Sequence, residues 1–120
     1  MRAMIGYLRE VVTSNQMAES LHAIFLDGNR RYLADAGVGQ GDVSSLSLRM
    51  RELYGKALAV GATGIILAHN HPSGICHPSR ADIEETRRLA AIGKALDIEL
   101  LDHLIITQDS AYSMRAGGDL

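Results

Sequence analysis

The stretch GIILAHNHPSGICHPSRAD, residues 64–82, decides how the rest of the chain has to be arranged. It opens with a run of apolar residues that is too short for a helix and is soon followed by a proline, so the run is typical of a buried strand. His69 and His71 follow this run two positions apart. Because residues i and i+2 of a strand point to the same face, both imidazoles can meet at one metal ion.

The residues after the histidines predict a loop and then a helix. Pro72, Gly74 and Pro78 exclude a regular continuation of the strand. A helical pattern begins after Ser79, and Asp82 lies about one turn into it, where its carboxylate can face the histidines. Two histidines and an aspartate make three protein ligands. Three ligands leave the fourth position of a tetrahedral zinc ion open for water, as in catalytic zinc sites.

This spacing resembles a known signature. His-x-His, seven residues, Ser, two residues and Asp is the JAMM motif of the JAB/MPN metalloprotease superfamily. The stretch HNHPSG at residues 69–74 resembles the RadC branch of this superfamily, as do IFLD at residues 24–27 and LLDH at residues 100–103. We therefore expect residues 15–120 to form a RadC-like JAB/MPN domain. Residues 1–14 are expected to be an N-terminal helix that packs on this domain or leads into it.

Composition limits the classes of protein that the chain can belong to. Its 120 residues suit one domain, and 47% hydrophobic with 22% charged residues is ordinary for a globular protein. A net charge of −2 and few aromatic residues argue against a dedicated nucleic-acid binder. No apolar run approaches the roughly 18 residues of a membrane span, and no signal peptide is evident. With a single cysteine, the chain fits a reducing cytoplasm, which is the expected location.

Hydrophobic spacing and turn signals predict eight elements. Helices are expected over residues 4–12, 46–58 and 80–96, and strands over residues 21–26, 30–34, 64–69, 100–106 and 112–114. Asp27-Gly28-Asn29 predicts a hairpin turn, and the three glycines in residues 37–41 predict a loop. Ser44 and Ser45 are candidate N-caps of the middle helix, and Gly61 is a candidate for the residue that ends it.

Strands and helices mix along the chain, with hairpins at both ends. This order favours an α+β fold, a three-layer α/β/α sandwich around a mixed, mostly antiparallel sheet. The JAB/MPN resemblance implies the same arrangement, which is described as cytidine-deaminase-like. The tail at residues 116–120 is expected to fray.

The resemblance also implies a chemistry and a set of site residues. It implies Zn²⁺ held by His69, His71 and Asp82, with a glutamate acting as general base. Aligned on Phe25-Leu26-Asp27, that glutamate is Glu19, and Glu52 on the middle helix is the alternative. The implied activity is hydrolysis of amide bonds, by a metallopeptidase or isopeptidase.

Four further residues near the motif have open roles. Ser79 is either the N-cap of the helix that follows or, as the resemblance implies, a donor to the oxyanion of the reaction. His103 is a candidate for a contact with a metal ligand. Cys76 and His77 depart from the usual composition of this loop and are either outward-facing loop residues or additional groups beside the metal.

The expected substrate is a peptide or a protein conjugate. Two other functions are considered: a DNA-repair-associated protein without hydrolase activity, which the charge does not support, and a catalytically silent JAB scaffold. No membrane association is expected, and exposed edge strands would make a homodimer unsurprising.

Overall fold

The computed structural model describes residues 2–13, 19–38 and 46–120. The elements, in chain order, are α1 (Arg2–Val12), β1 (Leu21–Leu26), β2 (Tyr32–Gly37), α2 (Leu46–Val60), β3 (Gly64–Asn70), α3 (Arg80–Ala95), β4 (Glu99–Ile106) and β5 (Ala111–Ser113). The strands pair in the order β2-β1-β3-β4-β5. Only the β3–β4 pair is parallel among the strands described, so the predicted mixed, mostly antiparallel sheet is confirmed.

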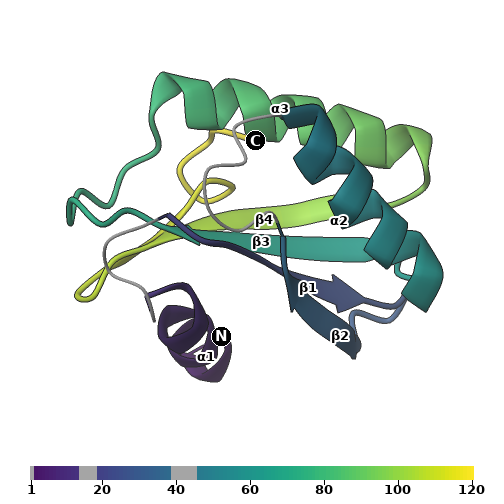
Figure 1. The fold of residues 1–120 in the computed structure, drawn as a ribbon, viewed down its shortest axis with the longest axis horizontal. Coiled ribbons are helices and arrows are strands. Elements are labelled where there is room, and N and C mark those ends of the chain that lie inside the picture. Colours follow the sequence, from purple (N-terminus) through teal and green to yellow (C-terminus); the bar gives the residue numbers. More distant parts are fainter. Residues whose placement is uncertain (1, 14–18, 39–45) are drawn as a thin grey trace.

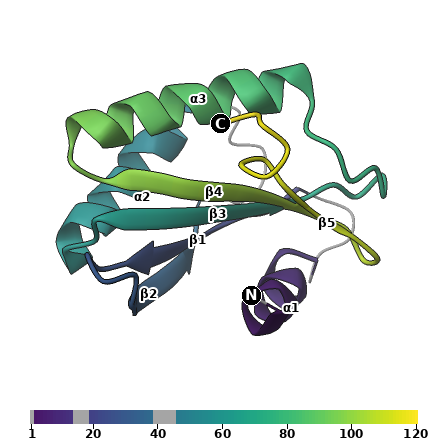
Figure 2. The same ribbon diagram turned by 180° about the vertical axis from the view of Figure 1, so that it is seen from behind.

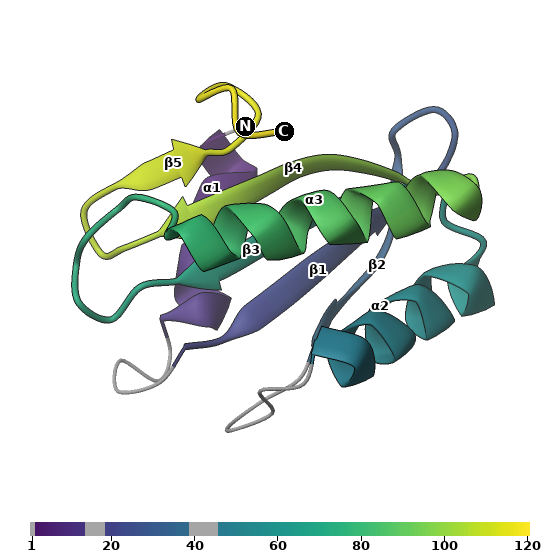
Figure 3. The ribbon, with the colours of Figure 1, turned by 90° about the horizontal axis from the view of Figure 1, so that it is seen from above.

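Helices cover both faces of the sheet. Figure 1 shows α2 and α3 on one face and α1 on the other, and Figure 2 shows the same layers from behind. Seen from above, α3 runs along the sheet with α2 beside it (Figure 3). The α+β, three-layer prediction is therefore confirmed. In the part of the chain that the structure describes, no helix combines the length and apolarity needed to cross a membrane.

Alternation along the strands builds a separate core on each face. In β3, Ile65 and Leu67 pack with α2 and α3, whereas Ile66 and Ala68 pack with α1. This period of two is what a strand buried on both faces requires. His69 is the next residue on the α3 side, so the alternation itself carries the first motif histidine toward α3.

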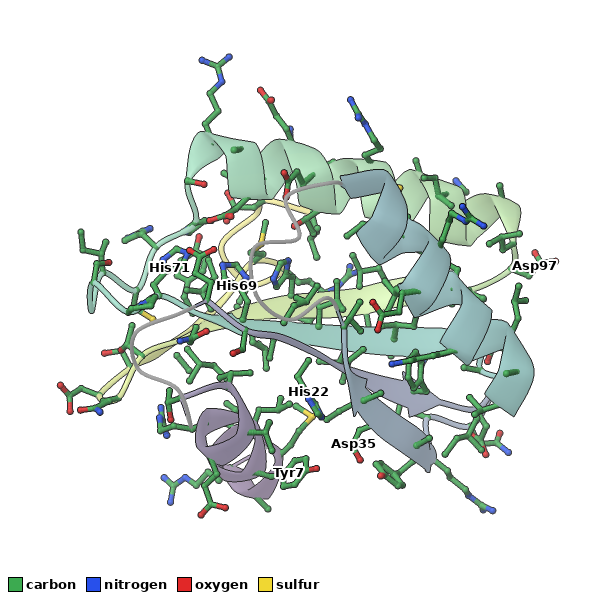
Figure 4. All side chains as sticks on the ribbon, in the orientation of Figure 1. Tyr7, His22, Asp35, His69, His71 and Asp97 are labelled. Atoms are coloured by element: carbon green, nitrogen blue, oxygen red, sulfur yellow. The ribbon has the colours of Figure 1, made fainter. Side chains whose placement is uncertain are left out.

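A polar cluster joins α1 to the edge strand β2. The Tyr7 hydroxyl of α1 donates to Asp35 Oδ2 at 2.5 Å, and His22 Nε2 lies 2.6 Å from the same oxygen. Tyr32 donates to the other carboxylate oxygen. Figure 4 shows Tyr7, His22 and Asp35 together on the α1 side, away from His69 and His71. The N-terminal helix thus packs directly on the sheet.

The predicted strand at residues 30–34, the hairpin partner of β1, begins too early. Residues 30 and 31 still belong to the turn, because the Asp27 carboxylate accepts the backbone N–H groups of Asn29 (2.8 Å) and Arg31 (2.9 Å). Arg30 adopts a positive φ of 63°. The strand therefore begins at Tyr32 and includes Gly37, which was predicted to begin a loop. Residues 39–41 and the candidate caps Ser44 and Ser45 lie outside the described residues.

Two further predictions concern the residue that ends α2 and the C-terminal tail. Gly61 follows α2 with a φ of +72° and donates to the Leu58 carbonyl, which confirms it as the residue that ends the helix. The expectation of a frayed tail was wrong. Arg87 of α3 donates to the Asp119 carbonyl at 2.9 Å, and the Tyr112 hydroxyl donates to the Asp119 carboxylate at 2.7 Å. These hydrogen bonds, which local composition cannot reveal, join residues 32 and 7 positions apart and hold the tail on the domain.

Candidate metal centre

The end of β3 brings two histidine rings together. His69 is buried, and His71 follows directly after the strand. Their Nε2 atoms are 2.9 Å apart and their ring centroids 4.7 Å apart. Figure 4 shows both rings at the end of the sheet near the start of α3. The predicted convergence of residues i and i+2 is what the structure has.

A tight turn in the motif loop orients the second ring. The Gly74 N–H donates to the His71 carbonyl at 3.0 Å, and Gly74 has a φ of +82°, which favours glycine. The turn places the Ile75 carbonyl oxygen 2.9 Å from His71 Nδ1. Because a carbonyl can only accept, His71 Nδ1 carries a hydrogen, and in the neutral imidazole Nε2 then has the lone pair. That lone pair faces His69 and Asp82.

The first turn of α3 supplies the carboxylate. Ser79 caps the helix: its hydroxyl oxygen accepts the Asp82 N–H at 3.0 Å, and Asp82 Oδ2 accepts the Ser79 N–H at 2.8 Å. The reciprocal bonds aim the carboxylate back past the start of the helix. Asp82 Oδ2 lies 3.2 Å from His71 Nε2 and 3.8 Å from His69 Nε2. The predicted cap and the predicted ligand are therefore parts of one local motif.

These three residues fit a tetrahedral metal ion. Their ligand atoms all lie within 4.8 Å of one another. Metal–ligand bonds of about 2.0–2.2 Å at tetrahedral angles put neighbouring ligand atoms roughly 3.3 Å apart. The observed separations of 2.9, 3.2 and 3.8 Å bracket this value. Two ring nitrogens so close together, with a carboxylate beside them, form a site that attracts a cation.

Burial and the neighbouring groups shift the pKa of Asp82 in opposite directions. Burial alone would raise the pKa of Asp82, but the Ser79 N–H bond and the nearby His69 and His71 rings together lower that pKa below its ordinary value. Asp82 is therefore ionised across the neutral range, as a metal ligand must be.

A second buried histidine stands behind the first. His103 on β4 places Nε2 at 2.6 Å from His69 Nδ1, and its own Nδ1 lies 2.8 Å from the Thr86 hydroxyl of α3. Burial lowers the pKa of His103 to about 3, so the ring is neutral. The structure thus places His103 in contact with His69, one of the three candidate ligands.

A cavity of about 240 Å³ opens beside His69 and Asp82. Glu19, Glu85 and Leu53 are among its lining residues, together with His69 and Asp82. Glu19 precedes β1, in which Leu21 pairs with His69 across the antiparallel ladder. The backbone N–H of Ser20 also donates to Asn70 Oδ1 at 2.6 Å, which holds this segment against the end of β3.

The alternative glutamate is placed differently. Glu52 lies on α2 and forms an ion pair with Lys56 at 3.2 Å, one turn along the same helix. It is not among the described residues that line the cavity. Of the two glutamates, Glu19 is therefore the one that shares a cavity with His69 and Asp82.

The remaining candidates divide into one that adjoins the ligands and two that point elsewhere. In the cap, Ser79 uses its hydroxyl oxygen as an acceptor, which leaves the hydroxyl hydrogen for a second partner. Cys76 donates its S–H to the Ile105 carbonyl, and burial raises the pKa of its thiol. The His77 ring packs on Tyr112 with centroids 5.0 Å apart. The group of ligand atoms found among the described residues includes neither Cys76 nor His77.

Two residues near the site were not recognised from the sequence. Thr86 and Glu85 both line the cavity, and neither is among the site residues predicted from the sequence. Asp82 and Thr86 are one helical turn apart, so a polar residue on the buried arc was a signal that could have identified Thr86. No local signal pointed to Glu85.

Comparisons with known proteins assign the chain to a family. A family model described as "RadC-like JAB domain" matches residues 1–119, α1 included. A UPF0758 protein of Thiobacillus denitrificans is 40% identical over 118 residues, which are 98% of this chain and 52% of that protein. One of Finegoldia magna is 39% identical over 99 residues, which are 82% of this chain and 44% of that protein. The chain thus spans about half the length of the curated relatives that it matches. It belongs to the RadC-like JAB domain family.

Proposed function

We propose that this chain is a zinc-dependent hydrolase of amide bonds, acting on a peptide or a protein conjugate. One observation carries the proposal: His69, His71 and Asp82 converge on one point, and the cavity beside His69 and Asp82 is also lined by a glutamate, Glu19. Three protein ligands leave one coordination position for a reactant, whereas a structural zinc site is closed by four. The combination of an open ligand set with an adjacent acid–base group is what hydrolysis requires.

Each residue has a distinct task in this proposal. When bound, zinc supplies Lewis acidity and lowers the pKa of a coordinated water to about 7. Glu19 takes a proton from the attacking water and passes it to the leaving amine, a role that typically contributes about 10²–10⁴ in rate. The Ser79 hydroxyl donates its free hydrogen to the substrate carbonyl oxygen as negative charge develops there. Ser79 can cap α3 and act as this donor at once, because the two roles use different atoms of the hydroxyl.

The donor set supports zinc over magnesium or calcium. Two imidazole nitrogens and one carboxylate oxygen suit zinc, whereas magnesium and calcium prefer sites built from oxygen alone. The histidines are also fixed by hydrogen bonds at their other ring nitrogens: His71 to the Ile75 carbonyl, and His69 to His103. Such outer contacts typically orient zinc-binding histidines.

Metal content is the first test. Wild type, His71→Ala and His77→Ala are loaded with zinc, desalted and measured by elemental analysis. We expect about one zinc per chain in wild type and in His77→Ala, and loss of zinc in His71→Ala. His77 is the matched control because it is a histidine of the same loop that packs on Tyr112. Absence of zinc from wild type would refute the proposal.

Activity is the second test. Zinc-loaded protein is screened against peptide libraries and against lysine-linked isopeptides, with Glu19→Gln and Glu52→Gln beside wild type. Loss of the general base should lower kcat by about 10²–10⁴ in Glu19→Gln, and Glu52→Gln should retain activity. If wild type binds zinc but cleaves nothing, or if Glu19→Gln is as active as wild type, the hydrolase assignment is wrong.

A further inference from the structure

A buried chain of polar groups links the two elements that supply the metal ligands. His69 Nδ1 on β3 lies 2.6 Å from His103 Nε2. His103 Nδ1 lies 2.8 Å from the Thr86 hydroxyl, which in turn reaches the backbone carbonyl of Asp82 at 2.6 Å. Thr86 is 1% exposed and His103 is 6% exposed, so water competes little for these bonds. The chain begins at one ligand residue and ends at another.

Counting hydrogens identifies the donor and the acceptor in each hydrogen bond of this series. The Thr86 hydroxyl has a single hydrogen, and the Asp82 carbonyl can only accept it. The hydroxyl oxygen must then accept from His103 Nδ1–H. A neutral imidazole has one N–H, so His103 Nε2 is an acceptor, and His69 donates to it from Nδ1. The lone pair of His69 is thereby left on Nε2, the nitrogen that faces His71 and Asp82.

The opposite order of donors and acceptors would prevent His69 from coordinating a metal ion. If the hydroxyl donated to His103 instead, His103 would carry its hydrogen on Nε2 and donate to His69 Nδ1. A neutral His69 would then carry its own hydrogen on Nε2, pointing at the position of the metal, and could not coordinate. The Asp82 carbonyl prevents this, because it takes the one hydrogen that could start the reverse chain.

We propose that Thr86, acting through His103, is a positioning residue that keeps His69 in the tautomer with hydrogen on Nδ1 and so prepares the site for a metal ion. This inference rests on the metal binding in the proposed function, but it concerns Thr86, which belongs to no motif quoted from the sequence, and His103, which lies outside the metal-binding signature. It explains why a threonine and a neutral histidine occupy a buried position behind the ligands. Hydrophobic side chains of similar size would fill the same space without setting a tautomer.

The tautomer can be measured without any metal. Long-range ¹H–¹⁵N spectra of zinc-free protein labelled at histidine report which ring nitrogen carries the hydrogen. We expect His103 to carry it on Nδ1 in wild type and in Thr86→Ser, which keeps the hydroxyl. In Thr86→Val no acceptor remains, so the hydrogen should move to Nε2. A wild-type spectrum with His103 protonated on Nε2 overturns the proposal, even if Thr86→Val fails to fold.

Zinc affinity provides the second readout, from competition with a chelator. Loss of an outer contact of this type typically weakens metal binding by about 10–100-fold, which is the effect expected for Thr86→Val. Thr86→Ser should bind nearly as tightly as wild type. The matched control is Thr107→Val, which removes another buried threonine hydroxyl, bonded to Ser110 in the β4–β5 turn, and should not change zinc affinity.

The outcomes separate the two proposals. If Thr86→Val binds zinc as tightly as Thr86→Ser, Thr86 does not set the tautomer and the inference is wrong. If wild type binds no zinc, the proposed function fails, while the zinc-free spectra still decide whether Thr86 orients His103. Equal weakening in Thr86→Val and Thr107→Val would point to a general loss of stability and would also overturn the positioning role.

Discussion

Gly93 tests how closely α3, the helix that carries Asp82, packs on the rest of the domain. A Cβ atom added at Gly93 would lie 2.4 Å from the Ile98 carbonyl oxygen and 2.8 Å from the Tyr54 hydroxyl. Neither neighbour is free to move away. The Ile98 N–H donates to the Gly93 carbonyl at 2.8 Å, and the Tyr54 hydroxyl donates to the Leu89 carbonyl. Gly93→Ala therefore forces a shift of backbone at the end of the helix.

Two effects of opposite sign determine the magnitude. Alanine is favoured over glycine inside a helix by about 1 kcal/mol, so without a clash Gly93→Ala would stabilise the protein. Overpacking a dense interior typically costs about 1–3 kcal/mol, and a 2.4 Å contact with a backbone atom belongs at the upper end of that range. The net expectation is a loss of about 1–2 kcal/mol in the free energy of unfolding.

Gly55 on α2 is the matched control. It is exposed, and a Cβ added there would meet no heavy atom within 4 Å. Gly55→Ala should therefore stabilise the protein by about 0.5–1 kcal/mol. Urea unfolding measures both variants, and an unchanged m-value shows that the shift in midpoint reports stability. If Gly93→Ala proves as stable as Gly55→Ala, α3 does not approach Ile98 as described and the reasoning is refuted.

Three further predictions concern helix ends and pH. Ser79→Ala should lower the free energy of unfolding by about 1 kcal/mol in urea, because the Asp82 N–H loses its cap, whereas Ser79→Gly should cost only a few tenths; equal losses would contradict the cap. Asp97→Gly should raise the melting temperature through a gain of under about 1 kcal/mol, because Asp97 follows α3 with a φ of 58°, which glycine adopts without strain; a lower melting temperature would count against this. Asp35→Asn should destabilise the protein at neutral pH. Burial alone would raise the pKa of Asp35, but hydrogen bonds from two tyrosines and His22 outweigh burial and hold that pKa below its ordinary 3.8. The stabilising contribution is thus complete above about pH 4 and is lost as the pH falls through the lowered pKa, so melting curves of the two proteins should converge in acid and not run parallel.

Local rules accounted for much of the candidate site. An apolar run followed by a proline indicates a strand that ends near His69, and the period of two puts His71 on the same face. Ser79 and Asp82 are spaced as a capping box, which places the carboxylate at the start of a helix from sequence alone. These features depend on residues only a few positions apart, so backbone geometry is enough to predict them.

Local rules failed where side-chain bonds decided the outcome. The Asp27 carboxylate extends the first turn and delays β2 to Tyr32, although the apolar pattern alone permits an earlier start. The C-terminal tail is polar and rich in glycine, yet bonds from Arg87 and Tyr112 hold it on the domain. None of these hydrogen bonds leaves a periodic pattern in the sequence.

Only the tertiary structure decided which residues surround the ligands. Antiparallel pairing of Leu21 with His69 brings the segment that contains Glu19 to the cavity. Parallel pairing of β3 with β4 sets Leu67 beside His103, so that this ring reaches His69 from 34 positions away along the chain. Thr86 completes the set because α3 packs over β4. The sequence by itself predicted the candidate ligands and brought them together, since their convergence follows from short-range geometry. The groups that orient them depend on strand register and helix packing, which no local pattern encodes.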